Sequence, residues 1–443
     1  MEELIKKAAP IFELLGDNEI YLVGGTIRDV LLGRQPRDLD FATSLDLIFV
    51  EDRLRSAGFT TWNIDKGPRV IGTKLINEDT GEVTVVEIAN YRGQTIEEDL
   101  EHRDFTINAM ATRDGKIIDP FGGLKDISKQ LIKCTKSSSD RFSEDPFRML
   151  RAIRFVSTLG FRLEERTKDN IEAYAHSILI TSKERWFNEL TKLLLGDNVK
   201  PALELLFKTR LLGYLLPEVY PITMTPRTQT SLTKDLWYHT KIVVSKSQLT
   251  LMVRWAALLH DIAKPQTMIE LTEGTHFFQH EYLGAELADA TLIRIRAGFE
   301  IRQSVRGLVS LHQRIGDTVS RGNDPPVSIN ALRRLARDCD VRKCNIEDLV
   351  ELFAADCSSG RKDVVERQQV HADLLRQALK KMREEDLRPR LPKGIGEALM
   401  AHFNLKPGPE VGELKKRLDD MLLSGTIISQ TPFDKMFKLL EEL

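Results

Sequence analysis

Residues 20–43 read Ile-Tyr-Leu-Val-Gly-Gly-Thr-Ile-Arg-Asp-Val-Leu-Leu-Gly-Arg-Gln-Pro-Arg-Asp-Leu-Asp-Phe-Ala-Thr, and this stretch decides the fold. The apolar run at 20–23 predicts a strand, because it is too short for a buried helix and two glycines stop it. Thr26 can cap a short helix that Gly33 ends. The predicted buried face of this helix consists of Ile27, Val30 and Leu31. A strand, a glycine turn and a helix N-terminus expose backbone N–H groups, which suit a phosphate.

Two carboxylates follow this helix. Asp38 and Asp40 begin a second predicted strand, whose period of two places both on one face. Like charges this close are costly unless a cation lies between them, and Mg²⁺ is the hard cation that prefers oxygen. Arg28 lies in the first helical turn, where helix stability does not require a cation, so it can serve a ligand. A bare Asp-x-Asp is also compatible with an Asx-rich turn, but the glycines upstream favour a nucleotide site.

The arrangement Gly24-Gly25-x-x-Arg28-Asp29 followed by Asp38-x-Asp40 resembles the signature of polymerase-β-like nucleotidyltransferases. It is most similar to the version in bacterial class II CCA-adding enzymes and poly(A) polymerases. The resemblance implies that Asp38 and Asp40 hold two Mg²⁺ ions. It also implies that Gly24, Gly25 and Arg28 contact the triphosphate of CTP or ATP. An RNA 3′-hydroxyl would then displace pyrophosphate.

A hairpin is predicted from residues 69–76 and 82–91, around the turn-rich tip Glu78-Asp79-Thr80-Gly81. Glu87 lies between apolar residues on one face of its second strand, which is unusual for a carboxylate. Because the family uses a third acid on a neighbouring strand, Glu87 is the candidate. An exposed glutamate on a strand face is the alternative.

Residues 97–112 are predicted to place Asp104 and Asn108 on one helical face. This segment resembles the family's Arg-Arg-Asp-Phe-Thr-Ile-Asn-Ala motif, with His102 in place of the first arginine. The resemblance implies that Arg103, Asp104 and Asn108 contact the nucleotide, and it leaves a contact through position 102 in doubt. A helix with a self-satisfied Arg–Asp pair is the alternative.

A helix is predicted to begin after Ser143 as its cap. Arg148, Arg151 and Arg154 recur on it at a spacing of three, which also fits a solvated face with salt bridges. The run Glu144-Asp145-x-x-Arg148 resembles the family's protein template. By that likeness Asp145 and Arg148 read the edge of the incoming base, and Arg151 and Arg154 support them. An aspartate accepts from the exocyclic amine that C and A share, whereas U and G present a carbonyl there.

A second constellation resembles an HD phosphohydrolase domain, in which such side chains hold one or two divalent metals on a helical bundle. Its members are His239, His260, Asp261, His280, His312 and Asp356. Asp356 is assigned by spacing alone. The alternative is a vestigial bundle that only holds RNA.

Composition limits the function classes. The net charge of −2 exerts no overall attraction on nucleic acid, so an RNA-binding surface must be local. The four cysteines show no zinc spacing and fit free thiols in a reducing cytosol. A signal-peptide core and an 18-residue apolar run are both missing from the sequence, so no membrane partner and a cytoplasmic location are expected.

At 443 residues the chain is too long for one core. The predicted fold is α+β: a polymerase-β-like nucleotidyltransferase head with a mixed sheet, then an all-helical neck, an HD-type bundle and a tail. The predicted domains are the catalytic head at 1–125, the neck with the nucleotide-selecting motif at 126–220, the HD-type domain at 221–365 and a helical, RNA-binding tail at 366–443. A linker is predicted near 221–235. The tail lysines and arginine are either tRNA contacts or solvated: Lys406, Lys415, Lys416 and Arg417.

The resemblance implies a tRNA 3′-terminal nucleotidyltransferase that adds C, as CC or CCA, from CTP and ATP. Between Arg92 and the predicted element at Glu97 only four residues intervene, which span at most roughly 14 Å. A shortened loop here resembles the CC-adding branch, whose product a separate A-adding enzyme completes. The rivals are a poly(A) polymerase or A-adding enzyme, an HD-type metal phosphohydrolase, and an RNA-binding protein with a decayed head. The intact Asp38 and Asp40 pair argues against the last.

Overall fold

The computed structural model describes most of the chain: residues 1–16, 20–65, 69–77, 80–225, 235–272, 274–315, 329–358, 362–387, 391–423, 426–427 and 430–441. The chain divides into two compact units, one of residues 1–315 with 338–369 and one of residues 316–337 with 370–443. Parts of two sequence predictions lie outside the described residues: Glu78 and Asp79 at the hairpin tip, and 226–234 of the linker. The sequence also predicts one charged helix over 366–393, of which residues 388–390 lie outside the described residues.

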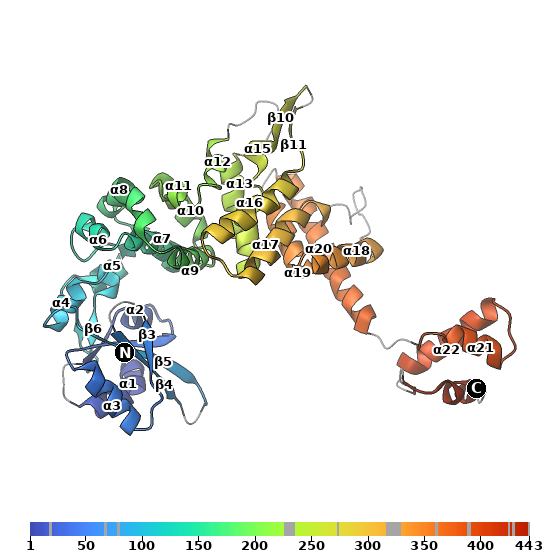
Figure 1. Cartoon of the computed structure of the whole chain (residues 1–443), viewed down its shortest axis with the longest axis horizontal. Helices are drawn as coiled ribbons and strands as arrows, with labels where there is room; N and C mark the ends of the chain where they lie inside the picture. Colours follow the sequence, from blue (N-terminus) through green and yellow to red (C-terminus); the bar gives the residue numbers. More distant parts are fainter. Residues whose placement is uncertain are drawn as a thin grey trace. The chain divides into compact units, whose positions relative to one another are not determined.

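The head contains a mixed seven-stranded sheet in the order β3-β4-β5-β2-β1-β6-β7 (Figure 1). Its strands are β1 Ile20–Val23, β2 Asp38–Thr43, β3 Trp62–Asp65, β4 Arg69–Ile76, β5 Val83–Asn90, β6 Ala111–Thr112 and β7 Ile117–Ile118. β2 and β5 pair in parallel, and the other neighbours pair antiparallel. The predicted strands at 20–23 and from Asp38, and the predicted hairpin, are confirmed.

Helices cover both faces of this sheet. On one face, α1 (Glu2–Leu15) and α3 (Leu47–Ser56) form a core with Leu39 and Phe41 of β2. On the other, Val23 and Ala42 pack with α4 (Ile96–Glu101). Because side chains alternate along β2, burying Leu39 and Phe41 on the first face directs Asp38 and Asp40 to the second.

The helix after β1, α2 (Gly25–Leu31), differs from its prediction in two respects. Gly24 occupies the N-cap, and Thr26 lies within the first turn, where its hydroxyl bonds to the backbone of β2 instead of capping the helix. Ile27 is buried, but Leu31 is exposed. The prediction that Thr26 caps the helix is therefore wrong, because its hydroxyl bonds to β2 instead. The prediction that Leu31 is buried is also wrong, because only one side of the helix contacts β2.

The neck is helical apart from two short paired strands. Its elements are β8 Leu131–Ile132, α6 Ser138–Glu144, α7 Phe147–Leu159, β9 Arg162–Leu163, α8 Glu165–Tyr174, η2 Ala175–Ile180, α9 Lys183–Leu194, α10 Val199–Lys208 and α11 Leu211–Leu215. η1 Thr106–Asn108 lies in the head, and α5 Gly123–Ser128 and α12 Tyr220–Met224 cross the predicted boundaries of the neck. α7 packs against α9 and α10. The predicted cap at Ser143 is wrong: Ser143 lies inside α6, because the chain completes that helix before Pro146 starts α7.

The HD-type region is a bundle of helices with one β-hairpin. Its elements are α13 Leu236–Lys246, α14 Leu251–Leu259, α15 Lys264–Thr267, β10 Met268–Leu271, β11 Gly274–Phe277, α16 His280–Arg294, α17 Phe299–Leu311 and α19 Ile346–Asp356. The chain passes from one compact unit to the other within α18 (Ile329–Val341) and within α20 (Lys362–Leu387). The neck and the bundle share packing, since Trp255 stacks on Phe187 at 5.6 Å and donates to Thr191 at 3.0 Å. The four domain boundaries stay predictions.

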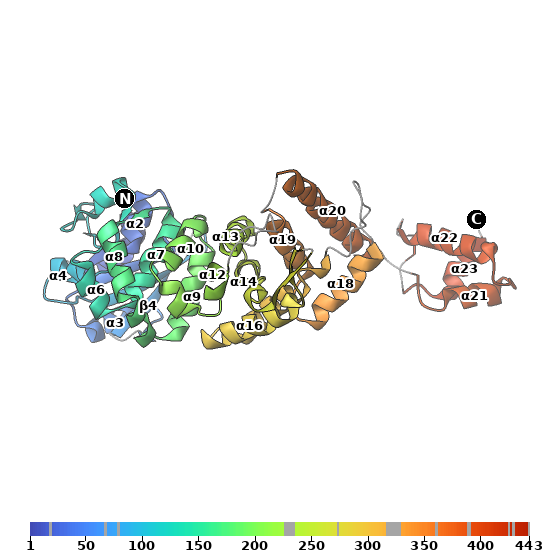
Figure 2. The same ribbon diagram turned by 90° about the horizontal axis from the view of Figure 1, so that it is seen from above.

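The C-terminal helices form a small core of their own, and Figure 2 shows them gathered together. They are α21 Ile395–His402, α22 Pro409–Leu423 and α23 Phe433–Glu441. The predicted helix that starts at Pro409 is confirmed, and its Leu418 and Leu422 are buried. In the described residues, no helix is both long and apolar enough to cross a membrane.

Candidate active site and metal cluster

Three carboxylates lie on one face of the head sheet. In the parallel pairing of β2 with β5, Asp40 lies opposite Glu87. The apolar neighbours of both residues along their strands belong to the core on the other face. Asp38 is exposed, while Asp40 and Glu87 are half-buried. Since adjacent strands lie about 4.8 Å apart, Asp40 and Glu87 can bind one cation together, with Asp38 two residues along the same strand.

The glycine turn opens directly onto these carboxylates. Gly24 has a φ of +75°, and a Cβ on it would lie 2.6 Å from Arg103 Nη1 and 3.7 Å from Asp40 Oδ2. A side chain at this position would therefore displace Arg103. The Thr26 hydroxyl donates to the Asp38 carbonyl at 3.2 Å and accepts from the Asp40 N–H at 3.3 Å. The turn, the helix and the acidic strand are thus held as one unit.

A chain of hydrogen bonds connects Arg28 to the arginines of α7. Arg28 Nη1 donates to Asn108 Oδ1 at 2.6 Å, and Asn108 Nδ2 donates to Asp104 Oδ1 at 2.9 Å. Asp104 Oδ2 accepts from Arg151 at 2.6 and 2.9 Å. Burial raises the pKa of Asp104, but Arg151 and the hydrogen bonds outweigh it and hold that pKa well below its usual range.

The predicted helix over 97–112 is wrong, although its two polar side chains do meet. α4 ends at Glu101, Phe105 is extended and bridges to Cys134, and η1 covers only residues 106–108. The Thr106 N–H donates to the Lys133 carbonyl, which ties this segment to the chain beyond α5. The periodicity of a local stretch of sequence cannot predict a hydrogen bond to a backbone carbonyl as distant as that of Lys133.

Phe155 lies beside three guanidinium groups, a role that the sequence prediction missed. The Cζ atoms of Arg154, Arg28 and Arg151 lie 3.6, 5.0 and 5.7 Å from its ring centroid. Arg154 also donates to Glu189 at 2.7 Å, and burial lowers the pKa of Arg154. The solvated-face alternative is therefore wrong for Arg154, whose side chain is largely buried, whereas Arg148 makes a local salt bridge to Glu144 of the kind that this alternative described. In the sequence, Phe155 showed only the ordinary apolar spacing of a core residue.

Asp145 and Arg148 lie at the start of α7, and both have protein partners. Asp145 Oδ1 accepts from the Phe147 N–H at 3.1 Å, and Oδ2 accepts from Arg185 at 3.1 Å. Arg148 donates to Glu144 Oε2 at 2.7 Å and to the His102 carbonyl at 2.9 Å. Position 102, where the family motif has arginine, thus supplies a backbone acceptor to this arginine. Arg185 had no signal in the sequence.

The connection between β5 and α4 is short and internally bonded. Thr95 caps α4 by accepting from the Glu98 N–H at 3.3 Å, and Glu98 Oε2 accepts from the Gln94 N–H at 2.6 Å. A Cβ on Gly93 would lie 2.6 Å from the Glu98 Cβ. Asp99 accepts from the Arg92 N–H at 3.2 Å and pairs with Arg103 at 2.9 Å. The connection is therefore coupled to an arginine beside the acidic strand.

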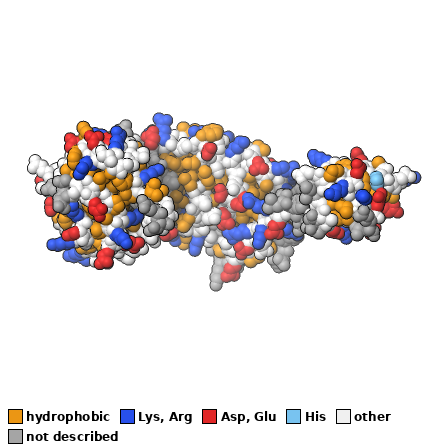
Figure 3. Space-filling view, turned by 90° about the horizontal axis from the view of Figure 1, so that it is seen from below, with side chains coloured by type: hydrophobic (Ala, Val, Ile, Leu, Met, Phe, Trp, Pro, Cys, Tyr) orange, Lys and Arg blue, Asp and Glu red, His pale blue; other side chains and the backbone are white. Residues whose placement is uncertain are grey.

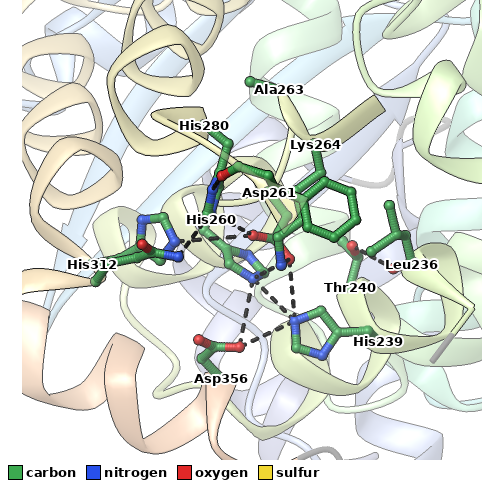
Figure 4. A network of polar contacts seen from close by, with 12 residues as sticks. Leu236, His239, Thr240, His260, Asp261, Ala263, Lys264, His280, His312 and Asp356 are labelled. Atoms are coloured by element: carbon green, nitrogen blue, oxygen red, sulfur yellow. Dashed lines mark hydrogen bonds and ion pairs between the residues drawn. The ribbon is translucent and has the colours of Figure 1, made fainter. Parts of the chain in front are cut away.

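The six residues of the second constellation come together from five parts of the bundle (Figure 4). Two groups each place their ligand atoms within 4.8 Å of one another: His239, His260 and Asp356, and Asp261, His280 and His312. His239 Nε2 lies 3.1 Å from Asp356 and 3.2 Å from His260 Nε2. Asp356, assigned from spacing alone, lies at the end of α19 among the histidines.

The donor set fits divalent metal. The Nδ1 atoms of His260, His280 and His312 each contact a backbone carbonyl three residues upstream, at 2.7–2.9 Å, which fixes each ring with Nε2 directed into the cluster. Asp261 Oδ1 is buried without a hydrogen-bond partner. Burial and the neighbouring His260 lower the pKa of His312 to about 4, which favours the neutral, metal-binding form of that imidazole.

Three family models match successive parts of the chain: the poly A polymerase head domain at 20–133, the probable RNA and SrmB-binding site of polymerase A at 160–222, and the HD domain at 245–344. The CC-adding tRNA nucleotidyltransferase of Thermus thermophilus is 30% identical, over 94% of this chain and 92% of its own length. The chain belongs to the family of CCA- and CC-adding tRNA nucleotidyltransferases. It is therefore an enzyme, a nucleotidyltransferase, of a family that uses divalent metal and CTP or ATP.

Other relatives cover the chain as fully. The CCA-adding enzyme of Lactococcus lactis subsp. cremoris strain SK11 is 28% identical over 99% of this chain and 98% of its own length. Among solved structures, the Bacillus stearothermophilus CCA-adding enzyme in complex with CTP matches with a TM-score of 0.58, at 22% identity over 100% and 99% of the two chains. The predicted fold class, with a mixed-sheet head and a mostly helical remainder, is confirmed.

Proposed function

We propose that this family member adds C residues to the 3′ end of tRNA from CTP and stops before the terminal A. The observation that carries the proposal is the short connection between β5 and α4, which internal hydrogen bonds hold in place. The Glu98 N–H donates to the Thr95 side chain, and the Glu98 carboxylate accepts from the Gln94 N–H. Reading first C and then A in one pocket requires that the pocket change shape. A five-residue connection with these bonds has little freedom to drive such a change. The relative that is 30% identical has the CC-adding name, which supports the proposal.

The three carboxylates Asp38, Asp40 and Glu87 are the proposed ligands of divalent metal, with Mg²⁺ as the ion. When bound, such ions activate an RNA 3′-hydroxyl and neutralise the charge of departing pyrophosphate. Arg28 and Arg103 flank the glycine turn at Gly24 and Gly25 and are the proposed cationic contacts of the triphosphate. Asp104 and Asn108 orient Arg28 and Arg151 by the bonds described above.

Base selection is assigned to Asp145 and Arg148, with Arg151 and Arg154 in support. A carboxylate accepts a hydrogen bond from the exocyclic amine of C. With U, the carboxylate oxygen would face a carbonyl oxygen, and binding sites strongly reject two acceptors that face each other. Because C and A both have this amine, Asp145 cannot distinguish them. The restricted shape of the pocket is therefore proposed to exclude A.

The test is product length. The enzyme is incubated with tRNA lacking its last three nucleotides, with CTP and ATP together, and the products are resolved at single-nucleotide resolution. We expect two added nucleotides and, after addition of a separate A-adding enzyme, a third. Efficient formation of the full three-nucleotide product by this enzyme alone overturns the C-only proposal. Incorporation of ATP alone into unstructured RNA would instead indicate the poly(A) polymerase or A-adding rival.

We propose a second activity for the bundle: a phosphohydrolase that depends on divalent metal bound by the six-residue cluster. The buried Asp261 Oδ1 and the convergent Nε2 atoms support metal binding. Asp261→Ala should lose bound metal by elemental analysis and lose phosphatase activity, while CTP addition persists. Glu270→Gln, an exposed change on β10, is the matched control. Purified wild-type enzyme that binds no metal and has no phosphatase activity would support the vestigial alternative.

The tail is proposed to contact tRNA phosphates. Lys406 and the α22 residues Lys415, Lys416 and Arg417 are exposed. The surface in Figure 3 intersperses cationic and anionic side chains, in keeping with the net charge of −2. Attraction for tRNA therefore depends on local groups of this kind.

A further inference from the structure

Arg185 lies in the first turn of α9 and reaches across to the start of α7. A cation at this end of a helix is disfavoured by the helix dipole, so the helix itself does not require it. The Arg185 Cζ lies 3.9 Å from the ring centroid of Phe147, and Nη2 lies 3.1 Å from Asp145 Oδ2. Stacking on an aromatic face holds a guanidinium in one plane, which orients its hydrogen bonds.

The Asp145 carboxylate is held at both oxygens. Oδ1 accepts from the Phe147 N–H and Oδ2 accepts from Arg185. An ionised carboxylate offers about four acceptor positions, so two remain for a ligand. The side chain of Asp145 is 35% exposed, which leaves those positions accessible. Among the hydrogen bonds of the described residues, only that from the Phe147 N–H would restrain the carboxylate without Arg185, and rotation about its terminal torsion would be easy.

We propose that Arg185 is a positioning residue for base selection. It holds the Asp145 carboxylate in the orientation that accepts a hydrogen bond from the exocyclic amine of the incoming nucleotide. The inference rests on the proposed role of Asp145 as a base reader, and it adds a residue from a different helix to the selecting device. The Arg185 guanidinium acts through Asp145 and does not contact the base.

Stability separates this role from a structural one. The side chains of Arg185 and Asp145 are 48% and 35% exposed, and exposed ion pairs contribute about 0–1 kcal/mol to folding. Arg185→Ala should therefore leave the melting temperature nearly unchanged. A residue that mattered only for packing would lower stability and leave base preference intact.

The experiment measures kcat and KM for CTP and for UTP on tRNA lacking its last three nucleotides. For Arg185→Ala we expect the CTP-to-UTP ratio of kcat/KM to fall about tenfold, mainly through a higher KM for CTP. Arg185→Lys should recover part of the ratio, because an ammonium keeps the charge but loses the planar stack. The control is Lys183→Gln, which removes a charge from an exposed residue of the same turn. A CTP-to-UTP ratio within twofold of wild type in Arg185→Ala overturns the inference.

A double variant distinguishes failure of the inference from failure of the proposed function. If Arg185 acts through Asp145, then Asp145→Ala with Arg185→Ala should have the same base preference as Asp145→Ala alone. If the double variant instead lowers the CTP-to-UTP ratio by the product of the two single effects, Arg185 acts independently of Asp145, and the inference is overturned. If Asp145→Ala leaves the preference unchanged, the reading role of Asp145 fails. If Asp145→Ala changes the preference and Arg185→Ala does not, the positioning role alone fails.

Discussion

At the scale of single residues, three arginine side chains lie beside the same phenylalanine, and each is held by an ion pair. Arg28, Arg151 and Arg154 all lie beside Phe155, and their mutual repulsion would be costly if left unpaired. Each has its own anionic partner: Asp29, Asp104 and Glu189, respectively. Arg151 and Arg154 are therefore already paired within the protein, and a nucleotide would join a network whose charges are satisfied.

The acidic strand provides the sharpest prediction at this scale. Asp40→Asn should reduce incorporation of labelled CTP about 10³-fold, a loss of about 4 kcal/mol in the barrier, because an amide is a poor ligand for a divalent cation. Circular dichroism should show an unchanged fold, since Asp40 is only half-buried. Asp52→Asn, an exposed change on α3, serves as control. Retention of a tenth of the wild-type rate would contradict the assignment.

Asp104 gives a pH-dependent prediction. Folding lowers its pKa below the ordinary 3.8, so the ionised carboxylate stabilises the fold above pH 3.8 and loses that contribution as the pH falls below it. Asp104→Asn should cost about 2 kcal/mol at pH 7, because Arg151 loses its charged partner. Urea denaturation at pH 7 and pH 3 should show a smaller difference from wild type at pH 3. An equal difference at both values would rule out this linkage.

At the scale of elements, α7 carries Arg148 and follows Asp145, the two residues proposed to select the base, and it makes close contact with the segment after α9. A Cβ on Gly196 would lie 2.7 Å from the Ser157 carbonyl oxygen, a backbone atom that cannot rotate away. The Ser157 hydroxyl donates to the Leu193 carbonyl at 2.6 Å, which fixes the same two helices together. The position of α7 relative to α9, and with it that of Arg148 relative to Arg185, therefore depends on a glycine at which neither residue is among the nearest neighbours of an added Cβ.

Gly196→Ala should force α7 and α9 apart, lower the melting temperature by several degrees and weaken discrimination between CTP and UTP. The contrasting variant is Gly412→Ala, since a Cβ at this helical position meets nothing within 4 Å. There alanine should be neutral or stabilising, by about 0.5–1 kcal/mol. Differential scanning calorimetry and the nucleotide assay measure both effects. Equal tolerance of the two substitutions would contradict the packing argument.

For the whole molecule, the division into units matters. The C-terminal helices bury Leu399, Leu418 and Phe437 in a core of their own. The aromatic rings of Phe403 and Phe437 lie 6.0 Å apart within this core. About fifty residues is close to the lower size limit at which a single core is stable, so independent folding is marginal but expected.

A fragment of residues 391–443 should give a helical spectrum and a cooperative, reversible thermal transition. Leu418→Ala should abolish that transition in the fragment. Truncating a buried leucine costs about 2–5 kcal/mol, which exceeds the free energy of unfolding expected of so small a core. Lys416→Ala, an exposed change on the same helix, should leave it intact. A non-cooperative fragment would show that the tail core depends on the rest of the chain.

Short-range pattern was enough to predict β2, the hairpin of β4 and β5 and the helix at Pro409, whereas the α+β class came with the family resemblance. The pattern also placed Asp38 and Asp40 on one face. Each of these pattern-based predictions follows from the fixed period of the local backbone, because alternation in a strand and the turn of a helix need no distant partner. The pattern also indicated a cation site at Asp38 and Asp40, whereas the family resemblance assigned their catalytic role and singled out the histidines.

Tertiary structure alone decided the partners. The register of β2 against β5 places Glu87 opposite Asp40, and the packing of α13, α14 and α19 brings Asp356 to His239. Periodicity failed at residues 97–112, where a backbone bond to Lys133 replaces helical bonds. Arg185, forty residues from Asp145, had no local signal at all. The physical reason is that hydrogen bonds and ion pairs depend on distances of about 3 Å, which packing sets between segments far apart in sequence.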